Sequence, residues 1–543
     1  MSLVRVTDLT VEFGGLRAVD GLSFTLERGA ALALVGESGS GKSTVASALL
    51  GLHHGTGARV GGSIEVAGTD VQAASDGELR RLRGAKAAMV FQDPLSSLDP
   101  YYAIGDQIAE VYRVHARGSR RAARARAVEV LDRVGIPDAR RRSRSRPHEF
   151  SGGMRQRALI AMALACEPEL LIADEPTTAL DVTVQAQILD LLHTLREETG
   201  MGLLLVTHDV GVAAESVDGV LVMRHGRVVE QGPVTAVLGA PAEPYTRELL
   251  SAVPRVDAVR TPAQASEEVE ESEESEEVVL EASGLRREFG RGKRALVAVD
   301  DVSLTVRRGE TLGVVGESGS GKTTLGRMLV GLLEPTAGEV RHDGHARAGV
   351  NPAVQMVFQD PVSSLNPRRS IGESIADPLR ARAMGLRGSD EGHVRARVTE
   401  LLERVGLEGA HYERYPHEFS GGQRQRVGIA RALAADPRVI ICDEPVSALD
   451  VTTQAQVVAL LGELQRELGL ALVFVAHDLA VVRQVSDRVA VMRRGRIVET
   501  GTADEVYDNP QNPYTRQLLA AVPALDPEAA ARRRAARREL ASA

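Results

Sequence analysis

Cysteine is almost absent from this chain of 543 residues, in which only Cys166 and Cys442 occur. Two thiols exclude a disulfide framework, and they exclude a zinc or iron–sulfur site built from four cysteines. Such sparing use of cysteine is typical of proteins that work in a reducing compartment such as the cytoplasm.

Long apolar runs are also missing. The longest, around Ala158–Cys166, is half of the roughly 18 residues that a membrane-spanning helix needs. The opening residues, MSLVRVTDLTVEF, alternate apolar and polar side chains and lack the basic-then-apolar pattern of a secretion signal. We therefore expect no membrane span in this chain.

A surplus of positive charge is lacking as well. Lys and Arg number 65 against 74 Asp and Glu, a formal charge of −9, whereas general nucleic-acid binders usually carry a basic excess. We interpret the arginine-rich stretches near Arg120–Arg126, Arg140–Arg146 and Arg532–Arg538 as two solvated helix faces and a frayed tail. Contact of the last stretch with lipid headgroups is the alternative.

What the chain does contain is a long internal repeat. Three strings occur twice in the same order: GESGSGK ending at Lys42 and Lys322, FQDPxSSLxP starting at Phe91 and Phe358, and PHEFSGG starting at Pro147 and Pro416. Self-similarity of this kind indicates a tandem duplication of one domain of about 250 residues.

The duplication predicts four segments: a first domain at 1–255, a linker at 256–278, a second domain at 279–525 and an Arg-rich tail at 526–543. The linker contains SEEVEESEESEE, a block of like charge that repels itself and cannot bury a core. We expect it to be flexible and extended. An acidic docking segment is the alternative.

Each copy contains a glycine-rich phosphate-binding loop between an apolar strand and a helix. In the first copy, Ala30–Val35 leads into Gly36–Ser43 and Thr44–Leu50 follows. This strand–loop–helix context predicts that backbone N–H groups cradle the phosphates, with the lysine on the β- and γ-phosphates and the next hydroxyl on Mg²⁺. The predicted nucleotide contacts are Gly36, Ser38, Gly39, Ser40, Gly41, Lys42, Ser43 and Thr44, with Gly316, Ser318, Gly319, Ser320, Gly321, Lys322, Thr323 and Thr324 in the second copy.

Lysine is scarce, occurring only at Lys42, Lys86, Lys293 and Lys322. Two of the four stand in these loops, where a compact ammonium serves better than a planar guanidinium.

Two acidic residues follow a second apolar strand in each copy. We expect Asp174 and Asp443 to hold Mg²⁺, and Glu175 and Glu444 to polarise the attacking water. His208 and His477 follow a third strand at a fixed distance from these acids. They are therefore interpreted as γ-phosphate contacts that also order the water, although a lone histidine after a strand is normally structural.

The remaining motifs decide which family of phosphate-loop proteins this is. Ser-Gly-Gly precedes a helical pattern in both copies and so provides a second set of backbone donors at a helix start. The order of phosphate loop, glutamine, Ser-Gly-Gly, Asp-Glu, Ala-Leu-Asp and histidine resembles the nucleotide-binding domain of ABC ATPases. The matching residues are Gln92, Ser151, Gly152, Gly153 and Asp181, and in the second copy Gln359, Ser420, Gly421, Gly422 and Asp450.

This resemblance implies an α/β fold with two tandem ABC-type nucleotide-binding domains of the P-loop NTPase class. Each would have a RecA-like core, an antiparallel β subdomain and an α-helical subdomain. It further implies that the Ser-Gly-Gly of one copy caps the ATP held by the other, and that Gln92 and Gln359 join the Mg²⁺ site. Phe13, 29 residues before Lys42, matches the aromatic residue that stacks on adenine. Phe289 is the second-copy candidate at a longer spacing of 33.

Two phrases narrow the family further. FQDPxSSLxP and the closing PYTRxLLxAVP resemble the oligopeptide, dipeptide and nickel importer ATPases, in the form that fuses both domains in one chain. The resemblance implies an ATPase with ATP and Mg²⁺ as cofactors, two transmembrane permease subunits and an extracytoplasmic substrate-binding protein as partners, and no nucleic acid. It places the chain peripherally on the cytoplasmic face of the inner membrane.

Two departures stand out: Met154 replaces the usual glutamine, and the carboxy-terminal cysteines of some relatives are missing. The alternative reading is a soluble tandem ABC ATPase acting on ribosomes or DNA. An acidic join of about twenty residues would be repelled by phosphate backbones, and neither heptads nor a zinc module is available for the DNA-acting type. The solute stays open among dipeptides, longer peptides, glutathione, nickel chelates and some sugars.

Overall fold

A computed structural model describes residues 2–178, 180–256, 277–290, 296–346, 349–360, 364–383, 391–447, 449–526, 529–530, 532–535 and 537. The predicted acidic linker lies almost entirely outside these residues. The chain divides into two compact units. Unit 1 comprises Met1–Val253 together with Pro523–Ala543, and unit 2 comprises Pro254–Val522.

Unit 1 contains two sheets. The first is antiparallel, in the order β2-β1-β4-β5, and the second has six strands in the order β10-β9-β3-β8-β7-β6. All neighbours in the second sheet are parallel except β9 and β10 at its edge. The strands are β1 Ser2–Phe13, β2 Leu16–Glu27, β3 Ala31–Val35, β4 Arg59–Val66, β5 Thr69–Asp70, β6 Ala87–Val90, β7 Leu170–Asp174, β8 Gly202–Thr207, β9 Gly219–Arg224 and β10 Arg227–Pro233.

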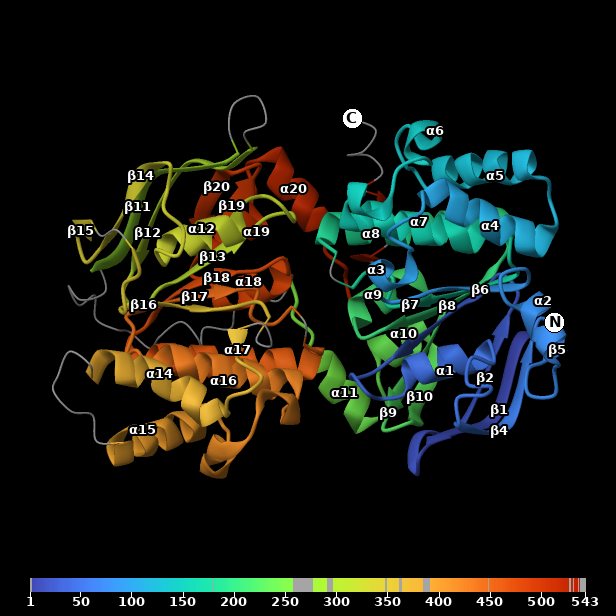
Figure 1. Ribbon diagram of the computed structural model, residues 1–543, viewed down its shortest axis with the longest axis horizontal. Coiled ribbons are helices and arrows are strands. Elements are labelled where there is room, and N and C mark those ends of the chain that lie inside the picture. The colour runs from blue at the N-terminus through green and yellow to red at the C-terminus, as the bar shows by residue number, and fades with distance from the viewer. Residues whose placement is uncertain are drawn as a thin grey trace. The chain divides into compact units, whose positions relative to one another are not determined.

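The helices of unit 1 fall mainly between β6 and β7 and after β7. They are α1 Lys42–Leu49, α2 Asp76–Leu82, α3 Pro94–Ser97, α4 Ile104–Ala116, α5 Arg120–Arg133, α6 Ala139–Arg142, α7 Gly152–Leu164, α8 Val182–Thr199, α9 Val210–Ser216, α10 Val234–Gly239 and α11 Pro244–Ser251, with a 3-10 turn at Pro147–Glu149. Within the unit, the layer of α4, α5 and α7 and the antiparallel sheet lie on opposite sides of the parallel sheet (Figure 1).

Two apolar cores explain this layering. Alternate residues of a strand point to opposite faces of a sheet, and in β7 Leu170 and Ile172 join the core beneath the antiparallel sheet. Leu171 and Ala173 join the core beneath the helices. Both faces of the parallel sheet are therefore covered, as continuous apolar runs such as Leu170–Ala173 predict.

Unit 2 repeats the plan, with sheets in the orders β12-β11-β14-β15 and β16-β17-β18-β13-β19-β20. Its strands are β11 Val278–Phe289, β12 Leu296–Arg307, β13 Thr311–Val315, β14 Ala337–His342, β15 His345–Ala346, β16 Val354–Val357, β17 Val439–Asp443, β18 Ala471–Val475, β19 Arg488–Arg493 and β20 Arg496–Thr502. Its helices are α12 Lys322–Leu329, α14 Ile371–Ala383, α15 Glu391–Arg404, α16 Gly421–Leu433, α17 Val451–Leu468, α18 Leu479–Val485, α19 Ala503–Asp508 and α20 Pro513–Ala520, with 3-10 turns at Gly409–Glu413 and Pro416–Glu418.

The predicted duplication and the predicted three-part α/β plan of each copy are therefore confirmed. Most of the extra length of the first copy lies between its short strand β5 and β6, where α2 stands. That helix begins with a capping box, in which Ser75 and Glu78 satisfy each other's backbone N–H groups.

Candidate nucleotide site

The carboxyl ends of β3, β7 and β8 bring the predicted residues of the first copy together. Parallel strands present their carboxyl ends at one edge of the sheet, and this edge is where open α/β sheets bind ligands. The phosphate loop follows β3, Asp174 ends β7 with Glu175 directly after it, and His208 follows β8. The corresponding ends of β13, β17 and β18 do the same in unit 2.

The glycine-rich loop is held in its curved shape by close backbone approaches. A Cβ on Gly36 would lie 2.2 Å from the carbonyl oxygen of Met223, and one on Gly41 would lie 2.4 Å from that of Ala18. Both residues, like Gly39, have positive φ, so a side chain at these positions is excluded by strain as well as by space. At Gly39 nothing lies within 4 Å of an added Cβ, so a ligand can approach the loop backbone there.

The loop lysines are nearly buried and point into the curve of their own loops. The Lys42 ammonium donates to the carbonyl oxygens of Gly36 at 2.8 Å and Glu37 at 2.9 Å. Lys322 donates to Gly316 at 2.7 Å and to the following residue at 3.0 Å. Each ammonium therefore stands where phosphate oxygens on the loop would meet it.

The predicted metal and base residues form two hydrogen-bonded groups in each unit. Ser43 donates to Asp174 at 3.0 Å. The Gln92 amide donates to Glu175 at 2.7 Å, and Nδ1 of His208 lies 3.2 Å from the other oxygen of Glu175.

In unit 2 the same three contacts recur. Thr323 donates to Asp443 at 3.0 Å, Gln359 donates to Glu444 at 2.7 Å, and Nδ1 of His477 lies 3.5 Å from Glu444.

Each glutamate is held in a rare backbone conformation. Glu175 has φ 46° and Glu444 has φ 48°, a region that costs a residue with a side chain about 1 kcal/mol or more. Their backbone N–H groups donate to Val206 and Val475 at 2.8 Å in both cases. Such strain clusters at functional sites because the surrounding structure enforces it.

The Ser-Gly-Gly motifs start α7 and α16, as predicted. Ser151 and Ser420 are the N-caps of these helices, and their hydroxyls accept from the backbone N–H groups of Met154 and Gln423 at 3.4 and 3.3 Å. Gln423 also accepts from the Ser420 N–H at 3.0 Å. Methionine has no group that can complete this capping box, so Met154 leaves the first helix start with only one of the two bonds.

Phe13 and Phe289 occupy equivalent places. Each is the last residue of the first strand of its antiparallel sheet and is partly exposed, at 37% and 40%. Phe13 pairs with Leu16 across its hairpin, and Phe289 pairs with Leu296. The longer spacing of Phe289 from its phosphate loop therefore comes from a longer hairpin connection, while the aromatic side chain keeps its position at the strand end.

Comparison with known proteins identifies the family to which this geometry belongs. The family model described as ABC transporter matches residues 19–178 and 299–447. The chain belongs to the ABC transporter family. The model described as oligopeptide/dipeptide transporter, C-terminal region, matches residues 229–277 and 498–542. The chain is thus an ATP-binding transport subunit with ATPase activity, and the predicted family is confirmed.

Several curated relatives are similar along nearly the whole chain. The glutathione import ATP-binding protein GsiA of Salmonella choleraesuis (strain SC-B67) is 48% identical over 547 residues, covering 94% of this chain and 87% of the relative. GsiA of Escherichia coli (strain K12) is 48% identical with the same coverage. Among solved structures, cbiO1 of Clostridium perfringens, part of the ABC transporter complex cbiONQ, is 29% identical over 43% of this chain and 92% of its own, with a TM-score of 0.38.

In both ABC domains, the pKa values of the adjacent aspartate and glutamate are shifted in opposite directions. Burial raises the pKa of Asp174 and of Asp443, against the opposing hydrogen bonds of Ser43 and Thr323. Burial acts in the same direction on Glu175, but the hydrogen bond and charge of His208 outweigh it and lower the pKa of this carboxyl. Its own hydrogen bond to Glu175 raises the pKa of His208. These contacts therefore favour the ionised form of the glutamate.

Three contacts in the ABC domains were missed by sequence reasoning. Thr178 donates to Glu175 at 2.9 Å, while its counterpart Ser447 bonds to the backbone oxygen of Glu444 at 3.2 Å. The hydroxyl of Tyr514, within the PYTR phrase, accepts from the backbone N–H of Glu317 in the phosphate loop at 3.2 Å. The phrase itself was visible in the sequence, but its contact with a loop almost two hundred residues earlier was not.

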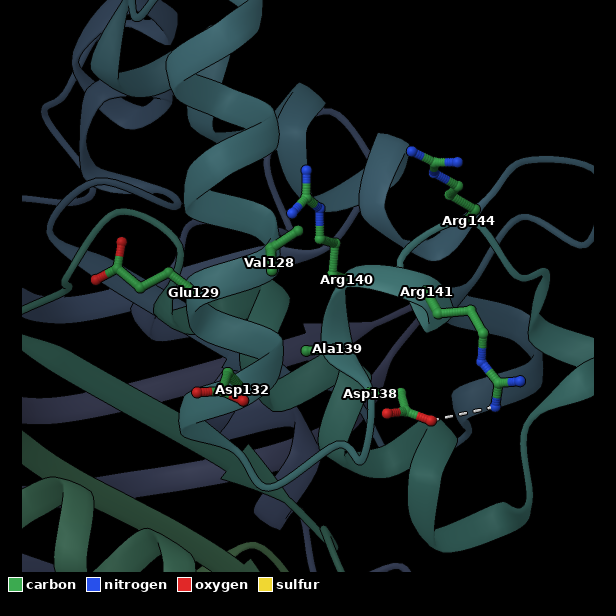
Figure 2. A pocket seen from close by; sticks show the side chains of 8 residues that line it. All are labelled: Val128, Glu129, Asp132, Asp138, Ala139, Arg140, Arg141 and Arg144. Carbon is green, nitrogen blue, oxygen red and sulfur yellow. Dashed lines mark ion pairs between the residues drawn. The ribbon is translucent and has the colours of Figure 1, made fainter.

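A separate cavity of about 720 Å³ lies on the helical part of the first ABC domain. Figure 2 shows its lining from α5, α6 and the residues that flank α6, including the ion pair of Arg141 and Asp138 at 3.3 Å. None of the predicted nucleotide residues lines it. Arg140, Arg141 and Arg144 are exposed there, which confirms the expectation of a solvated arginine face for these residues.

The same expectation is wrong elsewhere. Arg126 is 11% exposed and donates to the Ala165 carbonyl at 3.0 Å. The prediction of a frayed tail is also wrong for Arg534 and Arg537. These arginines donate to Glu215 and Asp190 of unit 1, which provide acceptors for them. In the described part of the chain, no helix combines the length and hydropathy that a membrane span requires.

Proposed function

We propose that this chain is the ATP-hydrolysing motor of an importer for small peptides, and that it supplies both nucleotide-binding domains to separate permease subunits. The observation that carries the proposal is the 48% identity with glutathione import ATP-binding proteins over 94% of the chain. The oligopeptide/dipeptide transporter region that follows each ABC domain supports the same class of solute, since glutathione is itself a small peptide.

The proposed hydrolysis uses the same residues in each copy. Glu175 and Glu444 accept a proton from the attacking water, and His208 and His477 orient that water and contact the γ-phosphate. Lys42 and Lys322 hold the β- and γ-phosphates, with Phe13 and Phe289 against adenine. The contacts of Glu175 with Gln92, Thr178 and His208 support this role because they fix where its carboxylate points.

The donors present suit Mg²⁺. A hydroxyl, an amide oxygen and a carboxylate are hard oxygen ligands of the kind this ion takes, usually with several waters. Ser43, Gln92 and Asp174 would hold it in the first copy, and Thr323, Gln359 and Asp443 in the second. When bound, Mg²⁺ neutralises charge on the phosphates. The bond from Ser43 to Asp174 already places a hydroxyl beside a carboxylate.

We also propose that each ATP is shared between copies. Ser420, Gly421 and Gly422 would cap the nucleotide on Lys42, and Ser151, Gly152 and Gly153 would cap the one on Lys322. The exposed position of Ser151 and Ser420 at their helix starts supports this pairing, because backbone donors there can meet a phosphate from outside the domain.

Two permease subunits and an extracytoplasmic binding protein are the proposed partners, with the chain held on the cytoplasmic face of the inner membrane through the permeases. The test begins with affinity purification of the tagged chain from its own membranes in mild detergent, followed by mass spectrometry of the bound subunits. These subunits are then coexpressed with the chain. We expect the chain in the membrane fraction only when both permeases are present.

The same preparation distinguishes an importer motor from a soluble tandem ABC ATPase that acts on ribosomes or DNA. ATPase activity in reconstituted vesicles should rise when the binding protein is loaded with glutathione or a dipeptide, and a sugar serves as the negative control. If the chain sediments with ribosomes, or with DNA, and ignores the permeases, the importer proposal is wrong and the soluble ABC reading takes its place.

A further inference from the structure

The segment Pro523–Ala543, called here the tail, follows the second ABC domain in sequence but belongs to unit 1. Leu525 packs against the apolar core of that unit. The Cβ of Pro523 lies 3.1 Å from the position a Cβ on Gly211 would take. Gly211 stands in the first turn of α9, three residues after His208. The tail therefore touches the helix that follows the histidine of the first ATP site.

Two arginines of the tail meet a built acceptor site. Arg537 pairs with Glu215 on α9, and their side chains are only 10% and 3% exposed. The same guanidinium donates to both carboxylate oxygens of Asp190 on α8, at 3.1 and 3.3 Å. Arg534 donates to the backbone carbonyl of Glu215 and lies 3.2 Å from Nε2 of His193. The carboxylates of Glu215 and Asp190 thus bind Arg537, and the backbone carbonyl of Glu215 accepts from Arg534.

The buried carboxylate needs a cation. Burial raises the pKa of Glu215, and the positive charge of Arg537 opposes that rise. An ionised side chain without a partner is strongly disfavoured inside a protein. Arg537, from the far end of the chain, therefore stabilises the ionised form of the buried Glu215.

The second copy lacks the same acceptor residues at the aligned positions. In the alignment that pairs His208 with His477, the positions of Asp190, His193 and Glu215 are Ala459, Gly462 and Gln484. The counterpart helix α18 has instead a buried arginine, Arg483, which pairs with Asp508 of its own unit at 2.8 Å. Only the first ABC domain carries the acidic acceptor set.

We propose that Glu215 and Asp190 form a docking site for the tail of the same chain, and that the docked tail restrains α9 in the first ABC domain alone. The tail is the segment that fits this site because its two arginines complement the charge of the two carboxylates. In addition, Leu525 of the tail packs against the apolar core of unit 1. The two ATP sites, equal in their catalytic residues, then differ in how firmly the helix behind the histidine is held. The proposal does not depend on the transported solute.

Hydrogen exchange of the full chain tests the restraint. Replacing Arg534 and Arg537 by alanine should speed amide exchange in α9 about tenfold or more, the scale expected when hydrogen bonds to charged groups are lost. Peptides from α18 are the internal control and should be unchanged. Arg532→Ala is the matched tail control, because that side chain is 71% exposed. Unchanged exchange in α9, or an equal change in α18, overturns the proposal.

A double-mutant cycle separates the ion pair from general damage. Glu215→Gln introduces the residue type of the second copy and removes the charge that needs a partner. In that background, Arg537→Ala should change exchange in α9 by less than about threefold, since interacting residues are not additive. If Arg537→Ala has the same effect in the wild-type chain and in the Glu215→Gln chain, the pairing is overturned.

Cross-linking decides whether the tail docks in its own chain. Gly211→Cys with Pro523→Cys, in a Cys166→Ala background, places two Cβ atoms close to disulfide range. Mild oxidation should give a cross-link within the monomer. Pro523→Cys alone in the same background is the control and should give no cross-link within the monomer. A disulfide-linked dimer, or no product from the double-cysteine chain, overturns docking in the same chain.

Discussion

At the residue scale, Glu175 and Glu444 are each constrained by both side-chain contacts and backbone conformation. Each accepts hydrogen bonds from a glutamine and lies against a histidine, and each occupies left-handed backbone space. Among the described residues, contacts around these glutamates also differ between the two sites, such as Thr178 against Ser447. Their equal geometry supports hydrolysis at both sites.

Glu175→Gln and Glu444→Gln should therefore each disable the site that contains them. Removing a general base costs ~10²–10⁴-fold in the chemical step, and each variant should accumulate a closed, ATP-bound state. If the sites work together, either single change lowers the steady-state ATPase rate of the assembled transporter far below half. Glu198→Gln, at a side chain 53% exposed, is the control. A near wild-type rate for one variant and none for the other would show unequal sites.

The contact of His208 with Glu175 predicts a pH dependence of stability. The pKa of His208 is raised above its ordinary 6.5, so the stabilisation is complete below about 6.5 and is lost as pH rises through the folded-state pKa. The lowered pKa of Glu175 places the acid-side loss below its ordinary 4.5. Thermal unfolding should show a decline above pH 6.5 that His208→Gln reduces. His148→Gln, at an exposed position, should keep the wild-type slope.

At the element scale, the starts of α7 and α16 differ by one hydrogen bond. Gln423 returns a bond to the Ser420 N–H, and Met154 cannot do so for Ser151. This difference concerns the stability of the helix start and leaves the backbone donors of both motifs in place.

Met154→Gln should complete the first capping box and stabilise α7 by up to about 1 kcal/mol. Gln423→Met should destabilise α16 by a similar amount. Hydrogen exchange of peptides from each helix, followed through a urea titration, measures both effects in one chain. A change in the helix that was not substituted would contradict the local explanation.

The strand–loop–helix elements could be predicted from sequence because their signals are local. The apolar run before Gly36 indicated β3, and the glycines themselves marked the turn into α1. The contacts of Thr178 and Tyr514 could not be predicted, since a hydroxyl has no spacing pattern that names its partner. The docking of Arg537 was missed for the same reason: an arginine-rich stretch looks alike in sequence whether it is solvated or buried against an acid.

At the scale of the whole molecule, the proposed pairing of copies makes residues far apart in sequence share one nucleotide. Ser420 would complete the site of Lys42, and Ser151 that of Lys322. Both serines are exposed at their helix starts, so each can be approached by a nucleotide that is not bound to the serine's own domain.

Ser420→Arg should therefore abolish retention of labelled ATP at the Lys42 site of a Glu175→Gln chain, because the long side chain fills the place of the phosphate. Affinity of the open phosphate loop should change by less than about twofold, as expected for a residue outside that loop. Ser151→Arg is the control and should spare the Lys42 site. Retention unaffected by Ser420→Arg would show that ATP lies within one copy.

The acceptor residues Asp190, His193 and Glu215 occur in one copy and are replaced in the other, and this fixes the order of the halves. A gene in which the two coding stretches were exchanged would keep every catalytic residue, yet its final arginines would follow the half that carries their acceptor. Recombination between the two similar stretches would keep the final arginines, and it would replace the acceptor by Ala459, Gly462 and Gln484 if the crossover fell before Asp190. The duplicated halves are thus no longer interchangeable in inheritance.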